Sequence, residues 1–346
     1  MSQATEEGRL DLAALTGNRL GPYLSFNPVS RVQIWQWCSA MGDRNPLYLD
    51  DAYRAATGFD RAVAPPAMMQ MWTMRDVNMT YAPGSTDTAP YQVLDTLAAH
   101  GFPANVAVSY DITFHRYLVE GDRAHHYTTV VAISDCKRTS LGEGHFVTER
   151  VEYLDQHDAL FAEALITYFQ YRPARGTPSG AAAAERHDDA PAEGAAPAAP
   201  APASTCVRDV RASELAVGDA LPELTIPITH KLIVSGAVAT QDFIDVHHNA
   251  PAARAAGMPD IFMNILTTCG LSARYLGDWA GPGSRLEKLA FKLLAPNTPG
   301  DTMVLRGQVA EIESAAQGDR VKVEFAGSNR LGFHVTGTAT LSLAAS

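Results

Sequence analysis

Two stretches of the sequence decide the fold: TQDFIDVH at residues 240–247 and MGDRNPLY at residues 41–48. Each contains an aspartate, Asp242 or Asp43, and each is followed by two alanines and then by a glycine, Gly257 or Gly58. The aspartate precedes that glycine by 15 residues in both stretches. Because this spacing has no gap, we interpret the stretches as copies of one internal repeat, so the chain is a fused duplication.

A glycine–aspartate pair marks the same place in both copies of the repeat. It is Gly121-Asp122 in the first copy and Gly300-Asp301 in the second. The aspartate of the repeat precedes this glycine by 78 residues in the first copy and by 58 in the second. The first copy therefore contains about 20 additional residues, which we assign to the segment between Arg75 and Asn105.

Residues 174–204 form the clearest boundary along the chain. These 31 residues include 13 alanines and 5 prolines but no bulky apolar side chain, so they have nothing to bury in a core. The scattered prolines also interrupt any helix. We interpret Ala174–Ser204 as a flexible linker between an N-terminal domain, residues 1–173, and a C-terminal domain, residues 205–346.

Both halves combine one helix-like segment with several strand-like runs rich in Val, Ile, Thr, Tyr and Phe. The predicted strands are Val106–Tyr117, His125–Ser134, Gly144–Leu154, Leu160–Tyr171, Leu286–Leu294, Thr302–Ile312, Val321–Ala326 and Gly332–Leu343. The predicted helices are Ala67–Met74 and Ile265–Leu276. One apolar helix followed by a meander of strands indicates an α+β fold, with an antiparallel sheet wrapped around a buried helix in each half.

The composition is that of a globular protein that binds neither nucleic acid nor an anionic membrane. Hydrophobic residues make up 46% of the chain, the formal net charge is −11 and the isoelectric point is near 5.4. A basic binding groove is therefore not expected. The cysteines at positions 38, 136, 206 and 269 lack metal-ligand or redox spacing, and no stretch is typical of a secretion signal or a membrane span. We expect a cytoplasmic protein with reduced thiols and no metal site.

The two copies of the repeat resemble the hydratase-2 motif of the MaoC-like dehydratases. That motif consists of Ser or Thr, Gly, Asp, any residue, Asn, Pro, an apolar residue and His. The first copy lacks the opening hydroxyl residue and has Tyr48 in place of the histidine. The second keeps Asp242 and His247 but lacks the Gly, Asn and Pro. The resemblance covers both halves and implies a double hotdog, in which two antiparallel sheets each wrap around a central helix.

Two further stretches are similar to the two subunits of bacterial enoyl-CoA hydratases that degrade the steroid side chain. DIFMNILTT at residues 260–268 resembles one subunit, and VAPPAM at residues 63–68 resembles the hydratase domain of its partner subunit. The resemblance implies a fusion of the two subunits that hydrates a trans-2-enoyl-CoA with (R) specificity and syn addition. It further implies a bulky substrate from cholesterol or bile acid catabolism, no cofactor beyond the substrate's own coenzyme A, a homodimer, and a downstream aldolase or thiolase partner.

Hydration of an enoyl thioester requires a base for the water, a proton for the α-carbon and a donor for the enolate oxygen. The motif positions assign the first two tasks to Asp242 and His247. An imidazole titrates near neutral pH, and a carboxylate can hold the other proton of the water. Their spacing of five residues does not fit one helix face, so a loop must bring them together. The neighbouring Asp245 and His248 form an alternative pair.

The predicted central helix of the second half supplies the oxyanion donor. Asn264 is suited to the N-cap position and to a contact with the substrate, and the Ile265 amide can donate at the start of the helix. In the first half the matching position is Pro66, which has no N–H. We therefore predict that only the second half is catalytic. The first half, with its additional segment 75–105, is predicted to accommodate a bulky acyl group.

Two alternative functions fit the same sequence. A hotdog thioesterase also binds acyl-CoA and uses a carboxylate, but it releases a free thiol. A non-catalytic acyl-CoA-binding partner subunit would bind acyl-CoA and hydrate nothing. An assay that follows both the enoyl absorbance and the release of thiol distinguishes the three functions.

Overall fold

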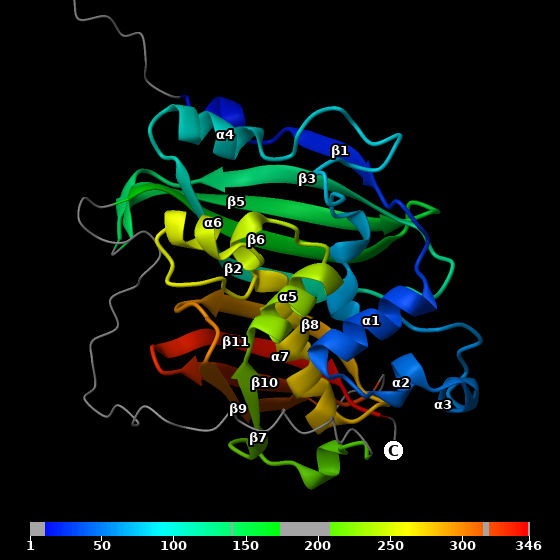
Figure 1. Cartoon of the computed structure of the whole chain (residues 1–346). Helices are drawn as coiled ribbons and strands as arrows, with labels where there is room; N and C mark the ends of the chain where they lie inside the picture. Colours follow the sequence, from blue (N-terminus) through cyan, green and yellow to red (C-terminus); the bar gives the residue numbers. More distant parts are fainter. Residues whose placement is uncertain (1–10, 140, 174–207, 314–317, 345–346) are drawn as a thin grey trace, which may run out of the picture.

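An antiparallel sheet of 11 strands is the framework of the molecule (Figure 1). The structure is a computed structural model and describes residues 11–139, 141–173, 208–313 and 318–344. The segment that we interpret as a linker, Ala174–Ser204, lies outside the described residues. The two chain segments on either side of it contribute one half of the sheet each.

The strands of the two halves differ little from the eight that the sequence predicts, and three more are added. The first half contains β1 (Arg19–Leu24), β2 (Ala104–Phe114), β3 (Ala124–Ile133), β4 (Lys137–Arg138), β5 (Gly142–Asp155) and β6 (Leu160–Pro173). The second half contains β7 (Ala220–Ile228), β8 (Arg285–Leu293), β9 (Asp301–Glu313), β10 (Arg320–Asn329) and β11 (Gly332–Ser342). All eight predicted strands are confirmed. The added edge strands β1 and β7 contain prolines, which weaken a strand pattern but are tolerated at a sheet edge.

Both halves have the same strand order. From the outer edge inward it is β1-β3-β5-β6-β2 in the first half and β7-β9-β10-β11-β8 in the second. The inner strands β2 and β8 pair antiparallel, from Ser109 opposite Lys292 to Thr113 opposite Lys288. The internal repeat is therefore a structural repeat, and the predicted double hotdog is confirmed, with its two sheets joined into one.

The helices lie mainly on one side of the sheet (Figure 1). They are α1 (Arg31–Met41), α2 (Pro46–Leu49), α3 (Asp51–Ala56), α4 (Gln92–Ala99), α5 (His230–Ala239), α6 (Ala250–Ala255) and α7 (Ile265–Ala280). Short 3₁₀ turns are η1 (Ala13–Leu15), η2 (Pro66–Met68), η3 (Met71–Thr73), η4 (Ala212–Glu214) and η5 (Asp245–His247). Among the described residues, no helix has the length and apolar character needed to cross a membrane.

The central helix of the second half is α7. Asn264 is its N-cap, and its side-chain oxygen accepts a hydrogen bond of 2.7 Å from the Thr267 N–H. Leu266, Cys269 and Leu276 are buried in the main hydrophobic core. The predicted helix Ile265–Leu276 is thus confirmed, and it continues for one more turn to Ala280.

The matching segment of the first half is not an α-helix, so the prediction of a helix over Ala67–Met74 is wrong. The turns η2 and η3 occupy this segment instead. Its side chains are almost all buried, Met68 and Trp72 among them. The run is therefore apolar at nearly every position, and its sequence has no periodicity that would distinguish a helix from short turns. The preceding Pro65-Pro66 also supplies no N–H groups to a first turn.

Two glycines allow α1, α5 and α7 to pack closely. A Cβ atom on Gly270 of α7 would lie 2.9 Å from the Met41 sulfur of α1, and one on Gly236 of α5 would overlap the Thr267 side chain. This close packing brings the C-terminal end of α5 next to the first turn of α7. The catalytic candidates lie at this junction.

The additional segment of the first half lies between η3 and β2 and contains α4. Val93, Leu94 and Leu97 of α4 form a small hydrophobic cluster with Val130 of β3 and Val147 of β5. In Figure 1, α4 lies at the end of the molecule near β1 and β3, away from α7. The additional segment therefore covers a part of the first sheet that α7 does not reach.

Candidate active site

Asp242 and His247 lie side by side in the chain segment that follows α5. Gln241 has a left-handed backbone, with φ of 55°, and turns the chain so that the Asp242 N–H donates 2.9 Å to the Ala237 carbonyl. The 3₁₀ turn η5 then brings back His247, whose Nε2 lies 3.6 Å from Asp242 Oδ2. The turn and η5 together form the loop that a five-residue spacing requires.

The other ring nitrogen of His247 determines which tautomer faces the aspartate. Nδ1 lies 2.8 Å from the Phe262 carbonyl oxygen. A carbonyl can only accept, so Nδ1 carries a proton. In the neutral ring Nε2 is then unprotonated and faces Asp242. His247 thus presents a lone pair at the place where a general base is needed.

The Asn264 side chain connects Asp242 to α7. Its Nδ2 donates to Asp242 Oδ2 at 3.0 Å and to Thr240 Oγ1 at 2.8 Å, while its Oδ1 caps the helix. One amide therefore orients the carboxylate and begins the helix. The N-cap prediction for Asn264 is confirmed, whereas its contact with substrate stays a prediction.

The pair is buried and keeps hydrogen-bonding capacity. Asp242 is 6% exposed and His247 is 7% exposed. The Oδ1 atom of Asp242 is buried and has no hydrogen-bond partner among the described residues. Asp242 Oδ1 and His247 Nε2 are both acceptors, so the site matches a small molecule with two hydrogens to donate, such as water.

The start of α7 adds donors to the site. The N–H groups in the first turn of a helix have no acceptor within the helix, and the helix dipole favours negative charge there. The Asn264 side chain satisfies the Thr267 N–H. The Ile265 N–H, at the first position of the helix, can therefore donate to an oxygen that gains negative charge.

The alternative pair, Asp245 and His248, has a different environment. His248 Nε2 lies 3.8 Å from Asp245 Oδ1, and the two side chains are 40% and 69% exposed. Water screens such a pair, and it has no connection to α7 comparable to that of Asn264. The geometry favours Asp242 and His247.

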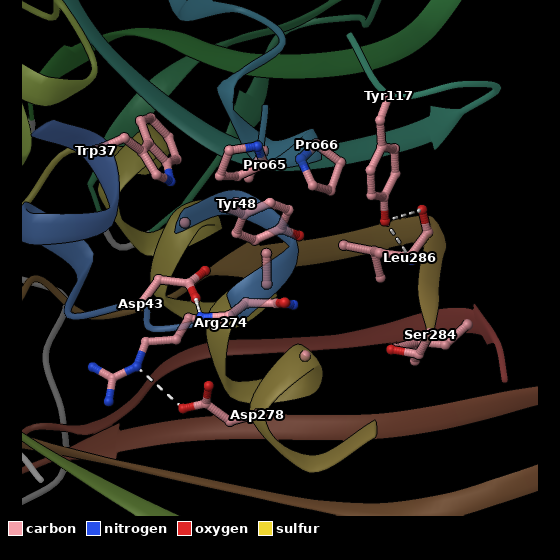
Figure 2. A pocket seen from close by; sticks show the side chains of 16 residues that line it. Trp37, Asp43, Tyr48, Pro65, Pro66, Tyr117, Arg274, Asp278, Ser284 and Leu286 are labelled. Atoms are coloured by element: carbon pink, nitrogen blue, oxygen red, sulfur yellow. Dashed lines mark hydrogen bonds and ion pairs between the residues drawn. The ribbon is translucent and has the colours of Figure 1, made fainter. Parts of the chain in front are cut away.

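The first copy of the motif builds a different site, which Figure 2 shows. Asp43, Tyr48 and Pro66 line one hollow together with Arg274 of α7. Pro66 begins η2 as Ile265 begins α7, but proline has no N–H to donate. The first half thus lacks both the imidazole and the amide of the second.

The charges of this first-half hollow are engaged in structural contacts. Burial raises the pKa of Asp43 to about 6, although the Asn45 N–H donates to its Oδ1 at 2.9 Å. Arg274 donates from Nη1 to the Met41 carbonyl at 2.9 Å, and its Nε lies 3.2 Å from Asp278 Oδ2. The hollow therefore has a buried aspartate and a cation that helps to hold α1 against α7.

A second hollow lies on the inner face of the first sheet. It is lined by Gln70, Thr73, Met74, Tyr81, Pro90, Tyr91, His126, Thr128, Glu149, Val151, Tyr153, Ile166 and Tyr168. Burial raises the pKa of Tyr91 and Tyr168, and the negative charge of Asp242 raises both further. We name this set of residues the acyl hollow.

The sequence analysis identified only part of the acyl hollow. Tyr81 and Tyr91 belong to the additional segment 75–105, but the lining from β3, β5 and β6 was missed. One signal was available: Glu149 interrupts an alternating strand in which Val147 and Val151 are core-facing. A charged residue at a core-facing position is a recognisable anomaly.

Comparisons with known proteins agree with this architecture. Residues 14–164 match the family model described as "FAS1-like, dehydratase domain region". The "Probable enoyl-CoA hydratase alpha subunit" of Thermomonospora curvata is 39% identical over 163 residues, which are 47% of this chain and 51% of that protein. The 3-oxo-4,17-pregnadiene-20-carboxyl-CoA hydratase beta subunit of Mycobacterium tuberculosis is 42% identical over 127 residues, 37% of this chain and 95% of that protein. The alpha subunit of the same name is 34% identical over 158 residues, 46% of this chain.

The chain spans about half the length of the two alpha subunits, 51% and 49%, and nearly all of the beta subunit. Among solved structures, a MaoC-like dehydratase superposes with a TM-score of 0.70 at 22% identity, over 97% of this chain and all of that one. A Mycobacterium tuberculosis protein described as a double hotdog superposes with a TM-score of 0.59 at 16% identity, over 94% of this chain and 96% of that one. These structures establish the fold. The beta-subunit relative, which this chain matches at 42% identity over 95% of that protein, shows that the chain belongs to the family of that acyl-CoA hydratase subunit.

Proposed function

We propose that the chain hydrates a trans-2-enoyl-CoA thioester to a 3-hydroxyacyl-CoA. The observation that carries the proposal is the buried Asp242–His247 pair, tied through Asn264 to the first turn of α7. This arrangement offers a base, a second acceptor and an oxyanion donor in one place. The hydratase names of the relatives support the same reaction class.

In the proposed reaction, a water molecule donates hydrogen bonds to His247 Nε2 and Asp242 Oδ1. Its oxygen forms a bond to the β-carbon while one of its protons moves to Nε2. The electron pair of the carbon–carbon double bond shifts toward the thioester, whose oxygen becomes an enolate. The Ile265 N–H donates to that oxygen, where the helix dipole also stabilises negative charge.

The enolate then collapses, and the α-carbon takes a proton from the His247 imidazolium, which restores the neutral ring. The adjacent Asp242 carboxylate stabilises the imidazolium between the two steps. One base that serves both carbons from one side yields syn addition. With the substrate bound as the family resemblance implies, the product has (R) configuration at the hydroxyl carbon.

The acyl group of the proposed substrate is bulky, and a steroid side-chain enoyl-CoA is our proposal for its identity. In this proposal the acyl chain extends from the site into the acyl hollow, toward β5 and β6. Two relatives carry a steroid-derived acyl-CoA in their names. The proposed reaction uses no cofactor beyond the coenzyme A of the substrate.

The proposed assembly is simpler than the names of the relatives suggest. These are alpha and beta subunits, whereas likeness to both occurs here in one chain. We propose that this fused chain supplies both halves of the site itself. The homodimer, the downstream aldolase or thiolase partner and the cytoplasmic location stay predictions.

Turnover of three substrates tests the function: crotonyl-CoA, a long-chain enoyl-CoA and a steroid enoyl-CoA with a three-carbon side chain. We expect loss of the enoyl absorbance with all three, fastest with the steroid, and chromatography should show the (R)-3-hydroxyacyl product. Release of free thiol would instead establish a thioesterase. Binding of all three without turnover would establish a non-catalytic acyl-CoA-binding subunit.

A further inference from the structure

Glu149 of β5 is a buried acid that the proposed reaction does not use. It is 2% exposed. The Thr128 hydroxyl donates a long hydrogen bond of 3.4 Å to Glu149 Oε2. Its Oε1 is buried and has no hydrogen-bond partner among the residues that the structure describes. One oxygen of this carboxyl therefore retains its full hydrogen-bonding capacity.

The nearest neighbours of Glu149 on the inner face of the sheet are apolar. Its cross-strand neighbours are Val130 on β3 and Ile166 on β6. Val147 and Val151 occupy the adjacent inward positions of β5. An acid in such a place costs stability unless a partner compensates it, so its presence indicates a role in binding.

The position of Glu149 within the acyl hollow indicates what that partner is. In the proposed function the thioester lies at His247 and the first turn of α7, and the acyl group extends from there into the acyl hollow. Glu149, on strand β5 of the first sheet, lines the same hollow. The part of the ligand that meets it is then remote from the reacting carbons.

We propose that Glu149 determines substrate specificity by hydrogen bonding to an oxygen, a ketone or a hydroxyl, at the end of the acyl group remote from the thioester. The inference rests on the proposed hydratase function for the identity of the ligand. The Oε1 atom donates to a ketone when the carboxyl is protonated. Acyl groups that end in hydrocarbon leave this oxygen without a partner and bind less well.

The protonation state of Glu149 agrees with a donor role. Burial raises its pKa to about 7, and the hydrogen bond from Thr128 opposes this increase. The titratable groups that line the hollow with Glu149 are Tyr81, Tyr91, Tyr153, Tyr168 and His126, and the charge of Glu149 also raises the pKa of Tyr23. The charges of Arg75 and Asp242 act on Tyr91. Burial raises the pKa of each of these tyrosines and lowers that of His126 to about 3, so they stay neutral at pH 6 to 8. In that range Glu149 is the acid of the hollow that gains and loses its proton.

A matched pair of substrates tests the proposal: two polycyclic enoyl-CoA thioesters that differ only in a ketone at the remote end. The variants are Glu149→Gln, which keeps a donor, and Glu149→Leu, which has none. The control variant is Glu152→Gln. Glu152 lies on the same strand as Glu149 and forms an ion pair with Arg19. Crotonyl-CoA, whose short acyl group carries no remote oxygen, is the control substrate, and melting temperatures report folding.

We expect the wild-type chain and Glu152→Gln to prefer the ketone substrate by about tenfold in kcat/KM. Glu149→Gln should keep most of the preference and Glu149→Leu should lose it, with crotonyl-CoA turnover unchanged. The wild-type preference should also fall as the pH rises from 6 to 8, whereas that of Glu149→Gln should not.

An undiminished ketone preference in a folded Glu149→Leu protein would overturn the proposal. So would an equal loss of turnover for crotonyl-CoA, which would indicate a structural role. Equilibrium binding of the saturated analogues of the two thioesters measures the ketone preference without turnover. A chain that hydrates nothing refutes the proposed function, and the binding preference then still decides the role of Glu149.

Discussion

The two halves of the molecule have the same strand order but differ at the start of the central segment. In the second half Asn264 caps α7 and donates to Asp242, which lies beside His247, and Ile265 supplies the first N–H of the helix. In the first half Pro66 starts a 3₁₀ turn, and Tyr48 replaces the histidine. A duplicated sheet can thus be kept while the motif residues of one copy change, because the sheet depends on many residues and the candidate site on a few.

The same difference changes the space that each half encloses. The 16 residues of α7 cover the second sheet, whereas η2 and η3 have three residues each. The first sheet is covered in addition by α4, and the acyl hollow lies against that sheet, lined by residues around η3, by the segment before α4 and by three strands. In the proposed function the first half supplies room for the acyl group, and the second half supplies the reacting groups.

The comparison of the two halves predicts that only the second half is catalytic, and variants of its aspartate and histidine test this most directly. Asp242→Asn or His247→Ala should lower kcat by about 10²-fold or more, because each removes a proton-transfer group. Acyl-CoA affinity should stay within a few-fold. Steady-state hydration of crotonyl-CoA measures both, and Asp43→Asn is the matched control with turnover near normal. Near-normal turnover in Asp242→Asn would transfer the assignment to Asp245 and His248.

A second prediction concerns the Asn264 side-chain amide, which connects Asp242 to α7. Asn264→Ala should lower kcat by about tenfold and the free energy of unfolding by about 1 kcal/mol, since it removes the cap and the hydrogen bond to Asp242. Asn264→Asp restores the cap but places a second acid beside Asp242. It should therefore recover stability in urea titrations without recovering turnover. Equal recovery of both would contradict the orienting role.

The buried aspartate of the first half should affect stability and not turnover. Burial raises the folded-state pKa of Asp43 to about 6, above about 4 in the unfolded chain. The folded state thus binds more protons between about pH 4 and 6, so this stabilisation is complete below pH 4 and is lost as the pH rises through 6.

Asp43→Asn, which carries no charge at any pH, should therefore be more stable than the wild-type chain above pH 6, by roughly 1–3 kcal/mol. Urea unfolding at pH 4.5 and pH 7.5 measures the change. A constant difference between the two proteins at both pH values would show that Asp43 does not titrate on unfolding.

The smallest expected effect is that restoring a histidine in the first half does not restore hydration. Tyr48→His, introduced into an Asp242→Asn background, should leave hydration at its residual level, because Pro66 still has no N–H for the enolate oxygen. Loss of one such donor costs about 10²–10³ in rate. Adding Pro66→Gly tests whether the amide was the missing part. Substantial rescue by Tyr48→His alone would show that another group stabilises the oxyanion.

Most of the strands could be predicted from the sequence, since alternating β-branched and aromatic residues define them locally. The strands β1 and β7 could not, because their prolines are compatible with a strand only at an edge, and the edges are defined by the whole sheet. The central segment of the first half was misassigned as a helix for a related reason. A run that is buried on every side has no periodicity to read.

The sequence by itself determined the duplication, the class of fold and the aspartate and histidine of the candidate site, because each depends on residue identity and spacing along the chain. Only the tertiary structure decided that Asn264 orients Asp242 as well as capping α7, and that Glu149 faces the acyl hollow. Both facts depend on contacts between distant segments: Asn264 reaches back 22 residues, and the hollow gathers side chains from the additional segment and three strands. Such proximity arises from helix and sheet packing, and no local pattern in the chain encodes it.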